Sequence, residues 1–266
     1  MSIFEAIILG VIQGLTEFIP VSSSGHLAIT QSFFGNGVDH LLIQALDFGT
    51  ILALLIYFRH KLAQIFTDVF FKKNYRLLRN VILTTIPAGG LGFALATAIE
   101  NNTFITKPAV VATFIVLVGI IMIILEKLPK LSPIADGEKL SSKRALTIGI
   151  AQTAALMPGV SRSGATIITS RLMGLKPAQA AEYSFLVSIP IMLGLIAKLC
   201  LSSDDRAYMA DNWQVLVAGN IAAFIAGMLA VTFLLNYLKK HPLTIFGWYR
   251  VIAGSIVLFL VAINVL

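Results

Sequence analysis

Residues 10–25 (GVIQGLTEFIPVSSSG) and 149–164 (GIAQTAALMPGVSRSG) share one plan, in which an apolar segment is interrupted by proline, serine and glycine. At a separation of 139 positions, six residues of the first stretch are identical to residues of the second. The identical pairs are Gly10 and Gly149, Gln13 and Gln152, Val21 and Val160, Ser22 and Ser161, Ser24 and Ser163, and Gly25 and Gly164. Proline removes a helix hydrogen-bond donor and biases the preceding residue towards extended geometry. We therefore expect two helix–break–helix hairpins, around residues 3–34 and 145–175, built as copies of one unit.

The composition around these stretches is that of a membrane protein. Hydrophobic residues make up 57% of the chain and charged residues 12%, with a mean hydropathy of +0.88, whereas a soluble domain carries about 25% charged residues. A water-soluble globule is therefore excluded. The net charge of +7 does not indicate nucleic-acid binding, because a basic excess in such a chain marks cytoplasmic loops. The single cysteine, Cys200, excludes an intrachain disulfide framework and a cysteine-based zinc site.

Six further segments are apolar and long enough to cross a bilayer, which takes about 20 residues of helix. They lie at about 41–58, 81–100, 108–125, 179–200, 213–238 and 244–265. Each half has three spans, and because an odd number of spans ends on the opposite side of the membrane, the second half must be inverted relative to the first. Inverted repeats with interrupted helices build a polar site near the bilayer midplane. The expected fold is an all-α polytopic membrane protein, a single membrane domain over residues 1–266. Repeat one covers about 1–128, a linker about 129–142 and repeat two about 143–266.

The loop charges follow this topology. The connections after the first span, in mid-chain and before the last span are basic, and the opposite side receives one lysine and an acidic loop with Asp204, Asp205 and Asp211. The positive-inside rule then places the basic face in the cytoplasm and both termini outside.

Each break supplies small hydroxyl residues and glycine just before a new helix. The free N–H groups of a helix N-terminus attract anions, and serine hydroxyls add donors. Arg162 adds a permanent positive charge and a fork of donors that matches phosphate oxygens. Two such termini that meet from opposite faces would form a pocket suited to phosphate. The alternative is a tight membrane turn with Arg162 reaching to the interface, although an intramembrane arginine is usually functional.

Three other polar residues belong to the first hairpin. Gln13 and Glu17 are four residues apart, so they share one helical face that points towards the break. Glu17 needs a partner in an apolar stretch: a metal, a proton or Arg162; the alternative is a solvated helix end. His26, near a helix N-terminus, is expected to be neutral and could activate a neighbouring serine, or it could be a packing residue. The roles of Asp47 and Glu182 stay open, with Glu182 a second candidate partner for Arg162.

These motifs resemble a known family. Residues 13–26 (QGLTEFIPVSSSGH) are similar to the first signature of the bacterial undecaprenyl pyrophosphate phosphatases, the BacA family, and residues 158–166 (PGVSRSGAT) are similar to the second. The resemblance implies an inner-membrane, multi-pass hydrolase of undecaprenyl pyrophosphate that depends on a divalent cation, Mg²⁺ or Ca²⁺. It also implies recycling of the lipid carrier for peptidoglycan synthesis, a part in bacitracin resistance, and a pocket open to the periplasmic face.

Carried onto this sequence, the resemblance implies a set of site residues. The catalytic residues would be Glu17, Ser23, His26 and Arg162, with Glu17 also near the metal. The substrate-binding residues would be Gln13, Ser22, Ser24, Gly25, Ser161, Ser163, Gly164 and Thr166. Some members have Glu where this chain has Gln13, so a mechanism that needs two carboxylates from that helix is in doubt here.

Three alternatives stay open at this point. The nucleophile could be Ser23 or a water activated by His26. A lipid-phosphate flippase or transporter would use the same anion pocket without chemistry. The partners are the polyprenyl pyrophosphate lipid and the surrounding membrane lipids, with no nucleic acid, and the sequence leaves a homodimer open.

Overall fold

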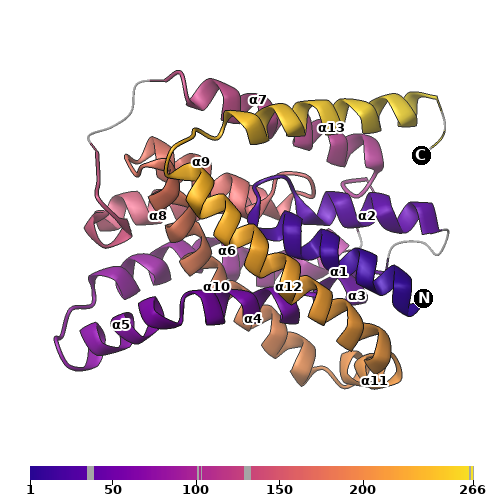
Figure 1. Ribbon diagram of the computed structural model, residues 1–266, viewed down its shortest axis with the longest axis horizontal. Helices are drawn as coiled ribbons and strands as arrows, with labels where there is room; N and C mark the ends of the chain where they lie inside the picture. The colour runs from indigo at the N-terminus through magenta and orange to yellow at the C-terminus, as the bar shows by residue number, and fades with distance from the viewer. Residues whose placement is uncertain (35–38, 101, 103, 129–132, 264, 266) are drawn as a thin grey trace.

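The computed structural model describes residues 1–34, 39–100, 102, 104–128, 133–263 and 265, and these residues form helices without a β-strand (Figure 1). The α-helices are α1 (Ile3–Phe18), α2 (Ser23–Phe34), α3 (His40–Ala45), α4 (Asp47–Tyr57), α5 (Arg59–Phe70), α6 (Arg76–Glu100), α7 (Pro108–Leu125), α8 (Ser142–Gln152), α9 (Arg162–Leu172), α10 (Pro177–Leu201), α11 (Ser203–Asp211), α12 (Trp213–Leu238) and α13 (Thr244–Ala262). Two short 3-10 helices, η1 (Gly137–Lys139) and η2 (Thr153–Leu156), complete the described structure. The all-α prediction is confirmed.

Within the described residues, six helical segments are long and apolar enough to cross a membrane. They are α3 with α4, the first part of α6, and α7, α10, α12 and α13, which correspond to the six predicted spans. The chain is therefore a multi-pass membrane protein. The second span begins earlier than predicted, at Arg76 instead of residue 81, because α6 continues from its apolar part into a basic first turn.

Four of the spanning helices' prolines lie either in the first turn of a helix or inside it, at positions that a membrane helix can accommodate. Pro108 and Pro177 occupy the first turn of α7 and α10, where the missing N–H would have no helical partner. Pro87 and Pro190 lie inside α6 and α10, which remain helical because neighbouring groups can satisfy the carbonyl that proline leaves free.

Glycine lets the hairpin helices approach the spans closely. On α1, Gly10 and Gly14 lie directly against the backbone of α12, at Gly219 and Ala223. On α8, Gly149 lies against the backbone of α6 at Thr84. Small residues at such crossings allow the van der Waals contact that drives helix association in lipid. The inverted repeat itself stays a prediction, and the reciprocal packing of α1 on α12 and α8 on α6 is compatible with it.

We predict that Gly10→Val destabilises the folded protein by about 1–3 kcal/mol, because its side chain would overlap the Gly219 carbonyl oxygen of α12. Thermal unfolding of the purified protein in detergent measures the loss. Gly90→Ala is the matched control, since a Cβ at Gly90 meets nothing within 4 Å. Equal melting temperatures for the two variants would contradict the packing described here.

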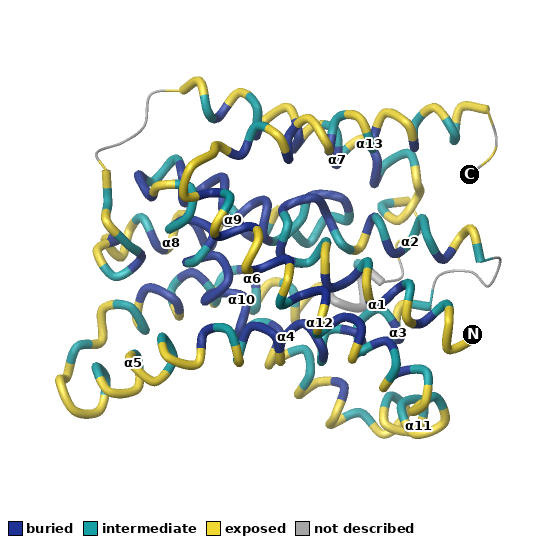
Figure 2. Tube along the Cα trace, viewed as in Figure 1, coloured by how far each residue is buried: buried dark blue, intermediate teal, exposed yellow. Residues whose placement is uncertain are grey.

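Both predicted breaks are present, and each is shorter than the quoted motifs suggest. The first lies between the end of α1 at Phe18 and the start of α2 at Ser23, and the second lies between η2 and the start of α9 at Arg162. Ser23 and Arg162 therefore open new helices. The helix pairs α1–α2 and α8–α9 converge in the centre of the molecule (Figure 1). α9 and the first half of α10 are buried almost throughout, while α5 and the outer faces of α7 and α13 are exposed (Figure 2).

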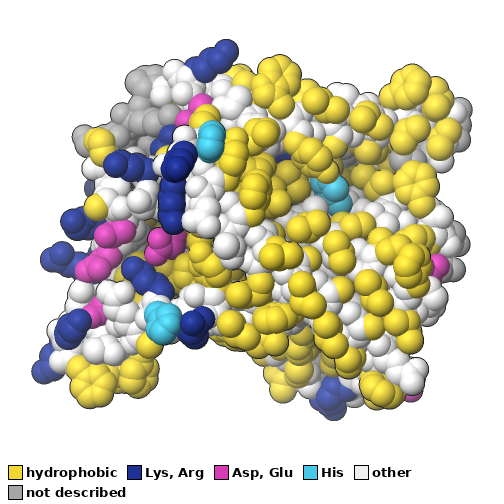
Figure 3. Space-filling model, viewed as in Figure 1, with side chains coloured by type: hydrophobic (Ala, Val, Ile, Leu, Met, Phe, Trp, Pro, Cys, Tyr) yellow, Lys and Arg dark blue, Asp and Glu magenta, His cyan; other side chains and the backbone are white. Residues whose placement is uncertain are grey.

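Charge is distributed unevenly along the molecule. In the view of Figure 3, Lys, Arg, Asp and Glu side chains gather at the left end, and apolar side chains cover most of the remainder. The N-terminus and the C-terminal end of α13 lie at the opposite, right-hand end (Figure 1). This arrangement matches the predicted separation of the basic loops from the termini.

Part of the predicted linker, residues 129–132, lies outside the described residues. The following segment is anchored to α6, because the Asn80 side-chain amide donates to the carbonyl oxygens of Gly137 and Leu140, at 2.9 and 2.8 Å. Its described part is therefore packed against the helices.

Candidate active site

Each break turns sharply at one serine. Ser22 and Ser161, which are paired in the sequence repeat, have φ angles of 79° and 75°. An L-residue rarely adopts this left-handed region, and such strain persists only where the surrounding structure enforces it, often at functional sites. The residues that directly follow these two turns, Ser23 and Arg162, both contact Glu17.

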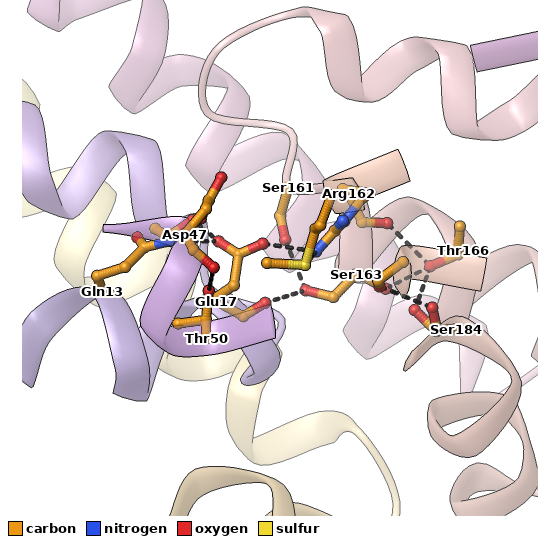
Figure 4. A network of polar contacts seen from close by, with 12 residues as sticks. Gln13, Glu17, Asp47, Thr50, Ser161, Arg162, Ser163, Thr166 and Ser184 are labelled. Carbon is orange, nitrogen blue, oxygen red and sulfur yellow. Dashed lines mark hydrogen bonds and ion pairs between the residues drawn. The ribbon is translucent and has the colours of Figure 1, made fainter. Parts of the chain in front are cut away.

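The two breaks meet through an ion pair. Arg162 Nη2 donates to Glu17 Oε1 at 2.5 Å, which joins the start of α9 to the end of α1 (Figure 4). Both side chains are largely buried, with 18% and 13% exposed. Arg162 Nη2 also approaches the Met192 sulfur on α10, while Arg162 Nε is buried without a hydrogen-bond partner among the described residues. An unsatisfied guanidinium N–H at a helix N-terminus is a donor that an anionic ligand can use.

Serine hydroxyls surround this pair. Ser23 Oγ donates to Glu17 Oε2 at 2.6 Å, so one carboxylate contacts both the serine and the arginine. From the second break, Ser163 Oγ donates to the Glu17 backbone oxygen at 3.3 Å and lies 3.1 Å from Ser161 Oγ. Ser161 Oγ in turn accepts from Gly164 N and so caps α9.

A second carboxylate reaches the site from another helix. Gln13 Nε2 donates to Glu17 Oε2 at 3.2 Å and to Asp47 Oδ1 at 2.5 Å (Figure 4). Asp47 opens α4, so the amide of Gln13 links two acidic side chains that are 30 residues apart in sequence. The Gln13 amide oxygen is buried and makes no hydrogen bond within the described part of the chain.

These side chains surround a cavity of about 130 Å³. Its lining residues are Glu17, Ser23, Ser24, Ala155, Ser161, Arg162 and Ser163. Six of the seven are residues that the sequence assigned to the site.

The remaining predicted residues lie behind the cavity or beside it. Ser22 is buried at the turn, and Gly25 packs against α7. Thr166 is buried, and its hydroxyl hydrogen-bonds with Ser184 of α10 and with the Arg162 carbonyl oxygen. Thr166 is therefore placed to hold the first turn of α9 instead of touching a ligand in the cavity.

His26 points to a different neighbour from the one the sequence suggested. Its Nδ1 lies 2.8 Å from the Ser22 carbonyl oxygen and its Nε2 lies 2.8 Å from Tyr249 Oη on α13, with the two rings stacked. Because a carbonyl oxygen only accepts, Nδ1 carries the hydrogen, and in the neutral ring Nε2 accepts from the tyrosine. Burial lowers the pKa of His26 and favours this neutral form. Since Ser23 donates to Glu17, the geometry gives the proton-acceptor position to that carboxylate.

We predict that Tyr249→Phe lowers turnover less than about tenfold, because it removes one neutral hydrogen bond from a ring that keeps its contact with Ser22. His26→Ala, which removes both contacts at the strained turn, is expected to cost orders of magnitude. The reaction that the family resemblance implies, release of phosphate, measures both effects with equal amounts of folded protein. A Tyr249→Phe variant as inactive as His26→Ala would show that the tyrosine contributes more than orientation.

Glu182 is not a partner of Arg162. Its carboxylate lies 3.8 Å from Lys61 Nζ, near the basic end of the molecule, and Glu17 takes the position beside the arginine. The ion pair with Glu17 also favours a ligand-binding role for Arg162 over a position at the membrane interface. The guanidinium points into the protein, towards Glu17 (Figure 4).

A comparison with protein families matches residues 6–256 to the family described as bacitracin resistance protein BacA. The chain belongs to the BacA family. It is similar to undecaprenyl-diphosphatase 1 of Clostridioides difficile (strain 630), at 38% identity over 97% of this chain and 96% of the relative. It is also similar to the undecaprenyl-diphosphatases of Aquifex aeolicus (strain VF5), at 35% identity over 96% and 97%, and of Christiangramia forsetii, at 38% over 96% and 96%.

The BacA-family match covers both breaks, so the cavity lies within the region that defines the family. Three residues that contact the site or its breaks have no role in the sequence prediction: Asp47, Tyr249 and Arg250. A charged residue inside an apolar span, at Arg250, was the available signal.

Proposed function

We propose that this BacA-family protein is an undecaprenyl-diphosphatase, which hydrolyses the terminal phosphate of undecaprenyl diphosphate and returns the monophosphate carrier to peptidoglycan synthesis. The observation that carries the proposal is the contact of Glu17 with both Ser23 and Arg162. It unites a hydroxyl, a proton acceptor and a phosphate-binding cation in one cavity. The names of the relatives support this activity.

The diphosphate head group of the substrate would take over part of the contact that Arg162 makes with Glu17. Phosphoryl transfer needs charge neutralisation at the phosphate oxygens and a nucleophile in line with the leaving oxygen. Arg162, with its unsatisfied Nε, and the hydroxyls of Ser161 and Ser163 would bind the terminal phosphate at the N-terminus of α9. Ser24, exposed in the cavity wall, would contact the second phosphate.

Ser23 is placed to attack, because its hydroxyl already donates to a carboxylate. Its oxygen would bond to the terminal phosphorus as the bond to the bridging oxygen breaks, and Glu17 would take the hydroxyl proton. The bridging oxygen leaves with its electron pair as undecaprenyl phosphate. Water then cleaves the phosphoserine, releases phosphate and restores the hydroxyl. The alternative nucleophile is a water molecule oriented by Glu17 and Ser23. Mass spectrometry of acid-quenched enzyme distinguishes the two routes, because only attack by Ser23 phosphorylates that residue.

The donor set fits a divalent cation of the Mg²⁺ or Ca²⁺ type. Both ions prefer oxygen ligands, and the site offers the carboxylates of Glu17 and Asp47 beside the unpartnered amide oxygen of Gln13. Among the described residues, no group of three or more His, Cys, Asp or Glu side chains is arranged to hold a metal. We propose that the oxygens of Glu17, Asp47 and Gln13 would hold the cation. Bound there, it would neutralise phosphate charge.

The charge pattern supports a proposal for the membrane placement. We propose that the protein lies in the bacterial inner membrane with its basic end in the cytoplasm and its termini outside. The family resemblance favours a cavity that opens to the periplasmic face. A flippase would need Arg162 and the helix N-termini but no serine paired with a carboxylate, and the names of the relatives give it no support.

The test is phosphate release from undecaprenyl diphosphate by the purified protein in detergent. We expect multiple turnovers with Mg²⁺ or Ca²⁺, loss of release with excess chelator, and recovery when the cation is restored. Asp47→Asn should raise the cation concentration needed for half-maximal release. Absence of phosphate release under all cation conditions would refute the proposed phosphatase activity. Release that persists with excess chelator would refute only the proposed dependence on a cation.

A further inference from the structure

Arg250, on α13, is fully buried with 0% of its surface exposed. Its guanidinium makes four hydrogen bonds to described residues, and each of them goes to a backbone carbonyl oxygen. The acceptors are Ile115 at 3.2 Å, Pro20 at 3.1 Å, Gly159 at 2.6 Å and Val160 at 3.1 Å. A buried cation usually pairs with a carboxylate, so this arrangement requires another explanation.

Three of the four acceptors lie in the two breaks, and the fourth, Ile115, lies on α7. Pro20 is in the first break, two residues before the strained Ser22, and Gly159 and Val160 are the two residues that precede Ser161 in the second. Carbonyl groups at such interruptions lack helical partners, and in a membrane each unsatisfied group is costly. Arginine suits this task, because one planar fork can donate to several fixed acceptors at once, whereas lysine offers a compact point charge.

Close backbone approach brings the guanidinium to this position. The Gly119 Cα on α7 leaves room for the Arg250 stem, since a Cβ there would lie 2.8 Å from the arginine's own Cβ. Gly159 has a φ of +94°, and a side chain at this residue would overlap the Val111 carbonyl oxygen. The guanidinium of Arg250 thus connects α13 to both breaks through hydrogen bonds.

We propose that Arg250 is a positioning residue of the reaction: it holds the two breaks at a fixed separation, so that Glu17 and Ser23 face Arg162 and Ser163 across the cavity. The expected effect of Arg250 on kcat rests on the proposed phosphatase activity, whereas its expected effect on the position of the two breaks does not. Arg250 does not line the cavity, so it acts through the backbone of the breaks. A displacement of catalytic groups by about 1 Å can lower the rate by about 100-fold.

Arg171 provides a matched control. It is also a buried arginine on a membrane-embedded helix, 6% exposed, but it pairs with Glu126 and with the Leu175 carbonyl oxygen at the far end of α9. Loss of Arg171 therefore removes a buried cation without releasing either break. A general stability effect should act on both variants, and a positioning effect should act only at Arg250.

The experiment compares full-length Arg250→Met, Arg250→Lys and Arg171→Met with the wild type, at a temperature where all are folded. For Arg250→Met we expect about a 100-fold loss in kcat with KM changed less than about threefold. Arg250→Lys should recover part of the loss, and Arg171→Met should keep kcat within about threefold per folded molecule. Should Arg250→Met not fold, the same comparison is made with Arg250→Lys, for which we expect about a tenfold loss in kcat.

Amide hydrogen exchange provides a readout that needs no activity. Arg250→Met, or Arg250→Lys in its place, should accelerate exchange in peptides that span residues 19–25 and 157–164, while Arg171→Met should accelerate it near residues 170–176. A kcat loss of equal size in the Arg250 and Arg171 variants, or unchanged exchange at both breaks in the Arg250 variant, would overturn the proposal. An inactive wild type would refute the phosphatase, and the exchange comparison would still decide the role of Arg250.

Discussion

Arg162→Ala is expected to lower the turnover of undecaprenyl diphosphate by about 10³-fold or more, the scale of losing an arginine that stabilises a phosphoryl-transfer transition state. The loss has two causes. The variant lacks the fork of donors that would bind the terminal phosphate, and it leaves Glu17 without the cation that lies 2.5 Å from its carboxylate. Because charge develops on the phosphate oxygens during transfer, the defect should fall mainly on kcat.

Arg162→Lys separates charge from geometry. Lysine restores a positive charge but not the planar fork, so we expect partial recovery that stays well below wild-type turnover. Melting temperatures of both variants control for folding. Phosphate release near the wild-type rate by a folded Arg162→Ala protein would remove the arginine from the mechanism.

Glu17→Gln should lower kcat by about 10²–10⁴-fold, the usual contribution of a general base. The amide keeps the size of the carboxylate but cannot take the proton from Ser23, whose hydroxyl lies 2.6 Å from Glu17 Oε2. It also weakens the hold on Arg162. Phosphate release from undecaprenyl diphosphate by equal amounts of folded protein measures this loss.

Glu182→Gln is the control for Glu17→Gln. Glu182 is a glutamate on a membrane span, but it faces Lys61 and lines no part of the catalytic cavity, so its loss should leave kcat within about threefold of the wild type. Equal rates for Glu17→Gln and Glu182→Gln would mean that neither carboxylate acts as the base.

The two breaks could be predicted because their sequence signals are local. Clusters of proline, serine and glycine interrupt apolar helices, and the repeat pairs Ser22 with Ser161, which share a positive φ angle in the structure. An arginine and a glutamate in apolar stretches each require a partner. The pairing of Glu17 with Arg162 was one of three options for the glutamate, and the structure selects it.

The remaining contacts depend on which helices pack together, which local patterns do not specify. Gln13 stands where some members carry a carboxylate, so the sequence predicts only one acid from α1 at this site. In the folded chain its amide contacts Asp47 of α4, so a second acid is present from a distant helix. The orientation of His26 likewise depends on Tyr249, 223 residues later. Serine spacing suggested that its imidazole would face Ser23, but the start of α2 at Ser23 turns the ring towards α13.

The central claim is that the two breaks face each other across one cavity. Cross-linking tests it most directly, with Ser24→Cys and Ser163→Cys introduced together after Cys200→Ser has removed the single native thiol. A short bifunctional thiol reagent is applied to the membrane-embedded protein, followed by trypsin and mass spectrometry. The prediction is a cross-linked product joining peptide 1–59 to peptide 163–171, formed within one chain and suppressed by inorganic pyrophosphate. Efficient modification of both cysteines without that product would contradict the claim.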